Sequence, residues 1–138
     1  MSNRLENKIA LVTGAGSGIG EAIAKRFAEE GALVYATDLN GESAVRVTAE
    51  IHAAGVRAQA RVQDVTDEAL WTTVIDEIVA QQGRLDVLVN NAGIVIPKSF
   101  EDTTLEEWRT TLAVNGESVF MGTRAGTVAM QSLGGSII

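Results

Sequence analysis

The sequence of 138 residues is 46% hydrophobic and 21% charged, which is the composition of an ordinary folded domain and excludes an intrinsically disordered chain. Its formal net charge of −7 argues against a nucleic-acid-binding protein, because contact with phosphate backbones needs clustered Lys and Arg. The absence of cysteine excludes disulfides and thiolate sites, and no apolar stretch near the amino terminus is long enough for a signal peptide or a membrane helix, so we expect a cytoplasmic protein without a membrane partner.

The first predicted elements are a strand, a glycine-rich turn and a helix. Residues 8–13 form a short apolar run typical of a buried parallel strand, and the sequence TGAGSGIG follows at 13–20. A helix over about 18–30 is indicated by apolar residues at every fourth position, with Gly31 at its end. Glycine lets a diphosphate approach the main chain closely, although such a turn could also be a plain strand-to-helix connection. The candidate binding residues here are Gly14, Ser17, Gly18, Ile19 and Gly20.

A second buried strand over residues 32–37 ends at Asp38. This residue follows the glycine motif at close to the roughly 20-residue interval at which an acidic side chain binds the ribose hydroxyls of a dinucleotide and repels a 2′-phosphate. Neither Leu39 nor Ser17 offers a positive charge to such a phosphate. The pattern therefore favours NAD over NADP, unless Asp38 is only a turn residue before Asn40.

The next predicted helix is capped by Asn40 and Gly55, and its histidine, His52, is interpreted as a solvated helix residue. Over residues 56–63 apolar and polar residues alternate, with Gln63 among the polar ones, which predicts an edge strand with one solvent-exposed face. Asp64 and Val65 follow this strand. Taken alone, Asp64 could simply be a carboxylate at the start of the next helix.

The third predicted helix, over about residues 70–83, has its apolar stripe at Leu70, Val74 and Ile78, and Trp71 beside it is interpreted as a packing residue. The fourth strand, residues 85–89, continues into Asn-Asn-Ala-Gly at 90–93, a segment that could also be a simple turn. We expect no metal site, because no group of metal-ligating residues stands out.

A long helix is predicted to begin at a capping box formed by Thr104 and Glu107. Asn115 falls on its apolar seam, which predicts a buried amide with hydrogen-bond partners. The seam consists of Trp108, Leu112, Val119 and Gly126. Close packing is expected at Gly122 and Gly126, since glycine is otherwise a poor helix former. Residues 133–138 begin a fifth strand.

The alternation of strands and helices predicts an α/β fold, a Rossmann doubly wound parallel sheet with helices on both faces, truncated after the fifth strand. We expect one domain over residues 1–138, because no repeat or linker marks a second one.

The motif at 13–20, together with Asp64, the Asn-Asn-Ala-Gly segment and Asn115 at their intervals, resembles the classical short-chain dehydrogenase/reductase family over residues 5–138. The resemblance implies that Asp64 and Val65 bind adenine. It further implies that the cofactor ribose is lined by Asn91, Ala92 and Gly93. Asn115 would sit at a helix irregularity and order a water in the proton relay, which makes it the candidate catalytic residue. The resemblance also implies a homo-oligomer assembled through the long helix.

The catalytic serine and the Tyr-x-x-x-Lys pair of that family would follow the position of Ile138. Tyr35 cannot replace that tyrosine, because Leu39 stands where the lysine should be, and Ser136 corresponds to a structural serine. We therefore expect an NAD(H)-dependent oxidoreductase that transfers hydride between NAD and a small-molecule secondary alcohol or ketone, with the 138-residue chain inactive alone. The alternatives are a non-catalytic nucleotide-binding module or inactive fragment, and a purely structural protein of Rossmann shape.

Overall fold

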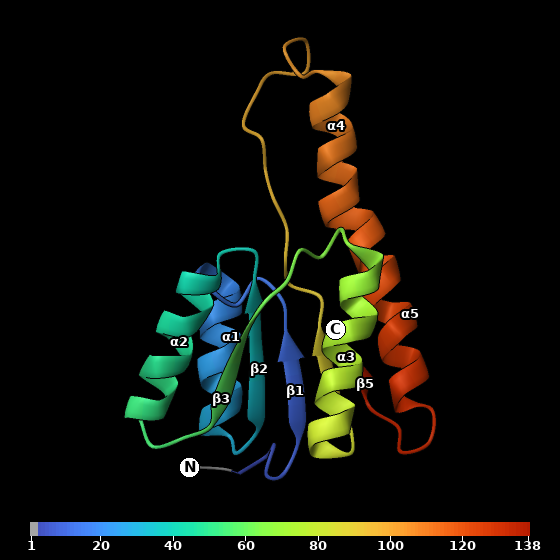
Figure 1. The fold of residues 1–138 in the computed structure, drawn as a ribbon. Helices are drawn as coiled ribbons and strands as arrows, with labels where there is room; N and C mark the ends of the chain where they lie inside the picture. The colour runs from blue at the N-terminus through green and yellow to red at the C-terminus, as the bar shows by residue number, and fades with distance from the viewer. Residues whose placement is uncertain (1–2) are drawn as a thin grey trace.

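The computed structural model describes residues 3–138, which form a parallel sheet of five strands in the order β3-β2-β1-β4-β5, with helices on both sides (Figure 1). The strands are β1 (Ile9–Val12), β2 (Leu33–Asp38), β3 (Ala58–Val62), β4 (Val87–Val89) and β5 (Ser136–Ile137). The helices are α1 (Gly18–Glu29), α2 (Gly41–Ala53), α3 (Glu68–Gln82), α4 (Leu105–Leu112) and α5 (Ser118–Met130), with the π-helix η1 (Ala113–Glu117) between the last two. This is the doubly wound Rossmann arrangement, so the predicted fold class is confirmed.

The central strand β1 pairs with β2 on one side, from Ile9 opposite Leu33, and with β4 on the other, from Ala10 opposite Val87. All four residues of β1 are buried. Along the chain, β1, β2 and β3 follow one another toward one edge of the sheet, and β4 then lies on the opposite side of β1. Ligands of such sheets bind at this reversal of strand order, beyond the carboxyl ends of the strands.

Two apolar layers hold the sheet between its helices. Alternate side chains of the strands point to opposite faces, so each face has its own core. One core joins the sheet to α1 and α2 and includes Ala10, Val12, Val34, Ala24, Ala28, Val47 and Ile51. The other joins it to α3 and α5 and includes Leu11, Tyr35, Leu88, Trp71, Ile78 and Met130.

The helix ends that were predicted from capping residues and glycines are confirmed. Asn40 accepts a hydrogen bond from the Ser43 backbone N–H at the start of α2, and Thr104 and Glu107 form the full capping box of α4. Gly55 and Gly83, which follow α2 and α3, have φ values of +80° and +79°, where a side chain would be strained. His52 is exposed as expected, and its Nε2 lies 2.9 Å from the Ala58 carbonyl oxygen.

The predicted alternation of β3 is only partly correct, although its place at the sheet edge is confirmed. Gln63, assigned to the solvent-exposed face, is buried, whereas Val62 is 61% exposed. Gln63 accepts a hydrogen bond from the Thr37 hydroxyl on β2 at 2.8 Å, which holds it inside. Val62 ends the ladder beside Gly41, the first residue of α2, where the helix layer covers the strand incompletely.

The predicted apolar seam of the long helix is wrong along most of its length. Trp108, Leu112 and Val119 are 55%, 44% and 36% exposed, and no residue of α4 is buried. α4 extends beyond the sheet (Figure 1), and the wider turn of η1 changes which side of the helix faces the body. The residues of α5 that are buried are Ser118, Gly122, Gly126 and Met130.

The two glycines of α5 pack closely, as predicted. A Cβ at Gly122 would lie 2.4 Å from Asn90 Oδ1 and 2.6 Å from the Trp71 ring. A Cβ at Gly126 would lie 2.8 Å from a Leu88 methyl group. These contacts bring α5 directly against β4 and α3.

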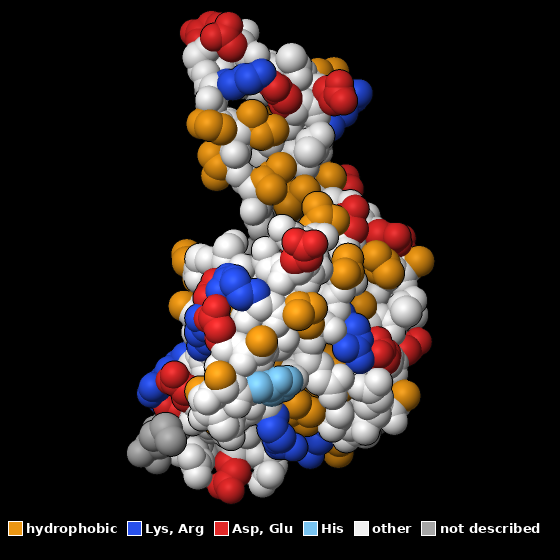
Figure 2. Space-filling model, turned by 60° about the vertical axis from the view of Figure 1, so that its left-hand side comes forward, with side chains coloured by type: hydrophobic (Ala, Val, Ile, Leu, Met, Phe, Trp, Pro, Cys, Tyr) orange, Lys and Arg blue, Asp and Glu red, His pale blue; other side chains and the backbone are white. Residues whose placement is uncertain are grey.

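We call residues 94–112 the arm, which comprises a loop and α4, and we call the remainder the body. The arm projects from the body (Figure 1), and apolar side chains lie on its surface (Figure 2). Val95 and Phe100 are 85% and 93% exposed.

Candidate cofactor site

A cleft of about 510 Å³ opens beyond the carboxyl ends of β1, β2, β3 and β4. Every predicted cofactor-contact residue except Gly20 lines it. These residues are Gly14, Ser17, Gly18, Ile19, Asp38, Leu39, Asp64, Val65, Asn91, Ala92 and Gly93, and they are joined by Gln63, Ile94 and Val114. The structure therefore brings together segments from Gly14 to Val114, at the place where the topology favours a ligand.

The start of α1 at this cleft lacks the side-chain cap that the other loop-initiated helices have. Ser17 is the N-cap residue of α1, but its side chain makes no capping hydrogen bond. Within residues 3–138, α2, α3 and α4 are capped by Asn40, Asp67 and Thr104. The first N–H groups of α1 are thus left without a side-chain acceptor, and with the helix dipole they favour an anion.

Gly14 and Gly20 have different roles in the turn. Gly14 lines the cleft with a φ of +61°, in the region that favours glycine. Gly20 lies one turn into α1, where a Cβ would come within 2.2 Å of the Gly14 carbonyl oxygen and 2.4 Å of Asn91 Nδ2. It is a packing residue that lets α1 approach the turn, and the structure does not place it among the cleft residues.

Thr13 and Asn91 connect the end of β1 to the segment after β4. The Thr13 hydroxyl donates to the Val89 carbonyl and accepts hydrogen bonds from the backbone N–H groups of Asn91 and Ala92, both at 3.1 Å. Asn91 Nδ2 donates to the carbonyl oxygens of Thr13 and Gly14 at 3.0 and 3.2 Å. Asn91 is therefore part of the scaffold that shapes the glycine turn, and not merely a turn residue.

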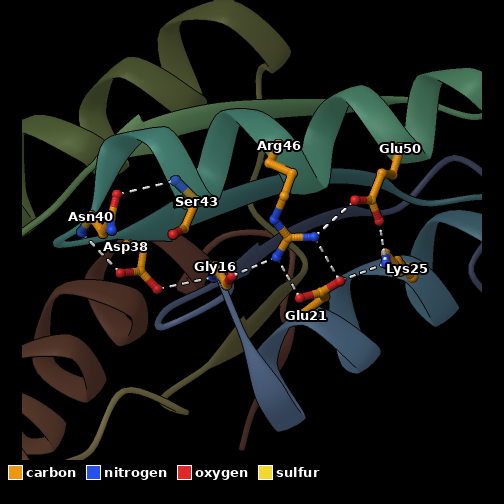
Figure 3. A network of polar contacts seen from close by, with 8 residues as sticks. All are labelled: Gly16, Glu21, Lys25, Asp38, Asn40, Ser43, Arg46 and Glu50. Atoms are coloured by element: carbon orange, nitrogen blue, oxygen red, sulfur yellow. Dashed lines mark hydrogen bonds and ion pairs between the residues drawn. The ribbon is translucent and has the colours of Figure 1, made fainter.

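Asp38 has its carboxylate fixed at the edge of the cleft. Oδ2 accepts a hydrogen bond from the Gly16 backbone N–H at 2.9 Å, and Oδ1 accepts one from the Asn40 N–H at 2.9 Å (Figure 3). The turn role considered from the sequence is thus present. The same bonds hold a negative charge beside Leu39 in the cleft lining.

The residues that follow β3 form the part of the cleft wall next to Asp38, whose carbonyl oxygen accepts a hydrogen bond from the Gln63 N–H at 3.0 Å. Asp64 Oδ1 accepts hydrogen bonds from both the backbone N–H and the hydroxyl of Thr66, at 2.9 and 2.6 Å, and the N-cap of α3 is Asp67 instead. The Val65 carbonyl accepts a hydrogen bond from Trp71 Nε1 at 2.8 Å, which confirms that this tryptophan is a packing residue.

Gln63 also lines the cleft, and the sequence analysis missed it. It is 1% exposed, and its Nε2 has no hydrogen-bond partner among the described residues. The strand alternation assigned this glutamine to the solvent-exposed face, so the prediction for Gln63 was wrong.

Asn115 lies in η1, so the helix irregularity expected at this residue is present. Its Oδ1 accepts a hydrogen bond from the Ile94 N–H, and its Nδ2 donates to the Ile94 carbonyl, both at 2.8 Å. The expected partners are found, but the expected burial is wrong, because Asn115 is exposed. Its partners belong to the first residue of the arm, which lies outside the core.

A group of charged residues between α1 and α2 was also missed. Arg46 on α2 donates to the Gly16 carbonyl oxygen and pairs with Glu21 and Glu50. Hydrogen bonds from Arg46 and from Lys25 lower the pKa of Glu21 to about 2. The i,i+4 pairs Glu21–Lys25 and Arg46–Glu50 could have been read from the sequence, but their contact across two helices could not.

Over residues 3–138 we find no cluster of metal-ligating side chains, and none of the helices there has the length and apolar character needed to cross a membrane.

Residues 8–138 match the family model described as short chain dehydrogenase. The chain is 48% identical over 139 residues to 2,5-dichloro-2,5-cyclohexadiene-1,4-diol dehydrogenase LinX of Sphingobium indicum, covering 100% of this chain and 56% of that protein. It is 44% identical over 140 residues to the NADP-dependent (R)-specific alcohol dehydrogenase of Lentilactobacillus kefiri, covering 100% of this chain and 55% of that protein.

Among solved structures, a short-chain type dehydrogenase/reductase from Mycobacterium marinum superimposes with a TM-score of 0.93 at 35% identity. The alignment covers 98% of this chain and 56% of that one. The chain thus spans about half the length of the curated relatives it matches.

Proposed function

Because the chain belongs to the short-chain dehydrogenase family, we propose that its cleft binds NAD and forms the cofactor site of an oxidoreductase acting on a secondary alcohol or ketone. The nicotinamide ring supplies the chemistry, by accepting or giving a hydride. The protein's part is to bind and orient the dinucleotide and to handle the proton of the substrate oxygen.

The observation that carries this proposal is the uncapped start of α1 at the cleft. Its free N–H groups and the backbone of the glycine turn fit a diphosphate. Asp38 would accept from the adenosine ribose, Asp64 and Val65 would hold the adenine, and Asn91 with its two successors would line the second ribose. Each of these groups lies on the wall of the same cleft.

The charge of the cleft favours NAD over NADP. Its described lining contains two carboxylates, Asp38 and Asp64, and no Lys or Arg. A 2′-phosphate next to Asp38 would meet a negative charge with no cation in the lining to offset it. The relative from Lentilactobacillus kefiri is called NADP-dependent, so cofactor preference has to be measured for this chain.

Binding and turnover are separate parts of the proposal. Tyr35, the only tyrosine, is fully buried, and its hydroxyl pairs with Gln81 and Gln82 of α3, so it cannot serve as the catalytic tyrosine. This favours a second description of the 138-residue chain, a nucleotide-binding module that is inactive alone. Asn115 would order a relay water once the family's Ser, Tyr and Lys are supplied.

We further propose that the protein is cytoplasmic and assembles as a homo-oligomer through α4 and α5.

Calorimetric titration with NAD and with NADP tests the binding proposal. We expect NAD to bind and NADP to bind at least about 10-fold more weakly, since about 1.4 kcal/mol of charge repulsion gives that ratio. Asp38→Asn should narrow the ratio, whereas Asp102→Asn, a matched change in the arm, should leave it unchanged. Equal affinity of the unmodified chain for both dinucleotides would refute the preference. A turnover assay with cyclic and acyclic secondary alcohols tests whether the chain alone is inactive.

A further inference from the structure

Gly16, in the middle of the glycine turn, is held from both sides by residues of the second βα unit (Figure 3). Its N–H donates to Asp38 Oδ2 at 2.9 Å, and its carbonyl oxygen accepts a hydrogen bond from Arg46 Nη2 at 3.0 Å. A Cβ at this position would lie 2.7 Å from the Ser43 Cβ, so α2 packs directly against the turn. The turn is therefore located by α2 and the end of β2 as well as by its own backbone.

Arg46 is itself held in one orientation by two carboxylates. It donates to Glu21 Oε2 at 2.7 Å and to Glu50 Oε1 at 2.8 Å, while Lys25 bridges the same two carboxylates at 2.6 Å each. Two positive and two negative side chains are thus joined between α1 and α2 (Figure 3). The guanidinium holds its donors in a rigid planar fork that spans three separate acceptors, whereas the three donors of a lysine rotate about one compact nitrogen.

The geometry of the peptide bond links Arg46 to the cleft. The Gly16 carbonyl and the Ser17 N–H belong to one planar trans peptide, so fixing the direction of one fixes the other on the opposite side. Ser17 is extended, with φ −162° and ψ 167°, and it lines the cleft at the uncapped start of α1. By holding the carbonyl, Arg46 turns the Ser17 N–H away from itself.

We propose that Arg46 is a positioning residue, which sets the Ser17 N–H of the glycine turn as a donor for the diphosphate of the cofactor. This inference rests on the proposed dinucleotide function, but it assigns a role to a residue outside the cleft lining. Glu21 and Glu50 act through Arg46, since they fix the fork that reaches Gly16.

The test compares two ligands on four proteins, namely the unmodified chain, Arg46→Ala, Arg46→Lys and the control Arg124→Ala. Arg124 pairs with Glu68 outside the cleft, and its side chain is 53% exposed against 48% for Arg46. NAD contains the diphosphate, and adenosine lacks it. We expect Arg46→Ala to weaken NAD binding by about 5- to 10-fold, the effect of losing one hydrogen bond. Adenosine binding should change less than about twofold in every variant.

Arg46→Lys separates positioning from ion pairing. It keeps a positive charge for Glu21 and Glu50, so its thermal midpoint should stay close to that of the unmodified chain, while its NAD affinity should fall nearly as far as in Arg46→Ala. An unchanged NAD affinity in Arg46→Ala, or a parallel loss of adenosine binding, would overturn the inference. So would full recovery of NAD binding in Arg46→Lys.

A ligand-free readout keeps the inference separate from the proposed function. The residual dipolar coupling of the Ser17 N–H, measured by NMR, should change in Arg46→Ala and stay the same in Arg124→Ala. If the coupling in Arg46→Ala equals that of the unmodified chain, Arg46 does not orient this group, whether or not NAD binds. If the unmodified chain fails to bind NAD, the proposed function is refuted, and the Ser17 coupling still decides whether Arg46 sets the turn.

Discussion

The body and the arm of this molecule are built by different rules. In the body, β1 and most of β2 are buried and every strand is paired, so long-range contacts locate each residue. In the arm, α4 has a complete capping box but no buried residue. Local sequence chemistry is therefore enough to specify a helix, whereas only packing gives it a place against the rest of the fold.

Beyond Ile94, which bonds to Asn115, the side-chain hydrogen bonds of the arm have the same local character. Ser99 donates to Asp102, Lys98 pairs with Glu107, and Thr103 donates to the Ser99 carbonyl. Partners that are close in the sequence hold the shape of a segment but add little to global stability, because they can persist while the body unfolds. Four predictions contrast positions that are packed in the body with positions that little or nothing covers.

The largest expected effect is a core truncation in the body. Leu11, fully buried in β1, and Leu105, 61% exposed in α4, form a matched leucine pair. Leu11→Ala should lower the free energy of unfolding by about 2–5 kcal/mol, since it leaves a cavity. Leu105→Ala should change it by less than about 0.5 kcal/mol. Urea denaturation followed by circular dichroism measures both, and similar losses at the two positions would remove the distinction.

A pair of glycines gives the next largest contrast. Gly20→Ala should destabilise the chain by about 1–3 kcal/mol and weaken NAD binding, because the new methyl group overlaps the Gly14 carbonyl and the Asn91 amide. A Cβ at Gly116 in η1 meets no atom within 4 Å, so Gly116→Ala should stabilise by up to about 1 kcal/mol. Thermal denaturation reports the sign of each change. A stabilising Gly20→Ala would contradict the packing role.

Helix caps provide a third comparison. Asp67 caps α3 in the body and Thr104 caps α4 in the arm, each by accepting a backbone hydrogen bond. Asp67→Ala should cost about 1 kcal/mol of global stability. Thr104→Ala should instead speed amide hydrogen exchange in α4 and leave the global unfolding midpoint in place, because α4 can open locally. A drop in the midpoint for Thr104→Ala would show that the arm unfolds together with the body.

The last comparison depends on pH. Hydrogen bonds from Arg46 and Lys25 hold the pKa of Glu21 at about 2, below its ordinary 4.5, so its carboxylate stabilises the folded chain above pH 4.5 and loses that contribution as pH falls toward 2. Glu21→Gln should therefore show a shallower loss of stability over this range. The hydrogen bond from Lys98 likewise lowers the pKa of Glu107. Because Glu107 lies in the arm, Glu107→Gln should leave the dependence of the global unfolding free energy on pH unchanged.

The positions of the strands along the chain, the glycine turn and most helix ends could be predicted from the sequence, because these depend on short-range periodicity and on capping residues. The candidate residues of the glycine motif and Asp38 were proposed from their spacing, whereas Asp64, Val65 and residues 91–93 came from the family resemblance. The fold brings all of them except Gly20 to one cleft, since a parallel sheet places the carboxyl ends of its strands at one edge. Asp38 shows the limit of this reasoning. Its spacing predicted a ligand contact, while its bonds to Gly16 and Asn40 became visible only in the fold.

The failures have a common physical cause, which is contact between distant segments. Gln63 is buried because Thr37 on the neighbouring strand reaches it, and no alternation pattern encodes that hydrogen bond. Arg46 was not singled out because its three acceptors lie on two helices and a turn. The seam through Trp108 was wrongly expected to be buried. Apolar spacing predicts which side of a helix is apolar, but not whether another segment covers that side.

The two hydrogen bonds between Asn115 and Ile94 have one more consequence. They join the beginning of the arm to the helix turn just after its end, so the residues between them form a closed loop of fixed span. Extending a loop whose ends are already fixed costs little, roughly 0.6 kcal/mol for each doubling of its length. The tip around residues 99–103 is thus a position where an inserted peptide tag or a reporter cysteine would leave the sheet and the cleft undisturbed.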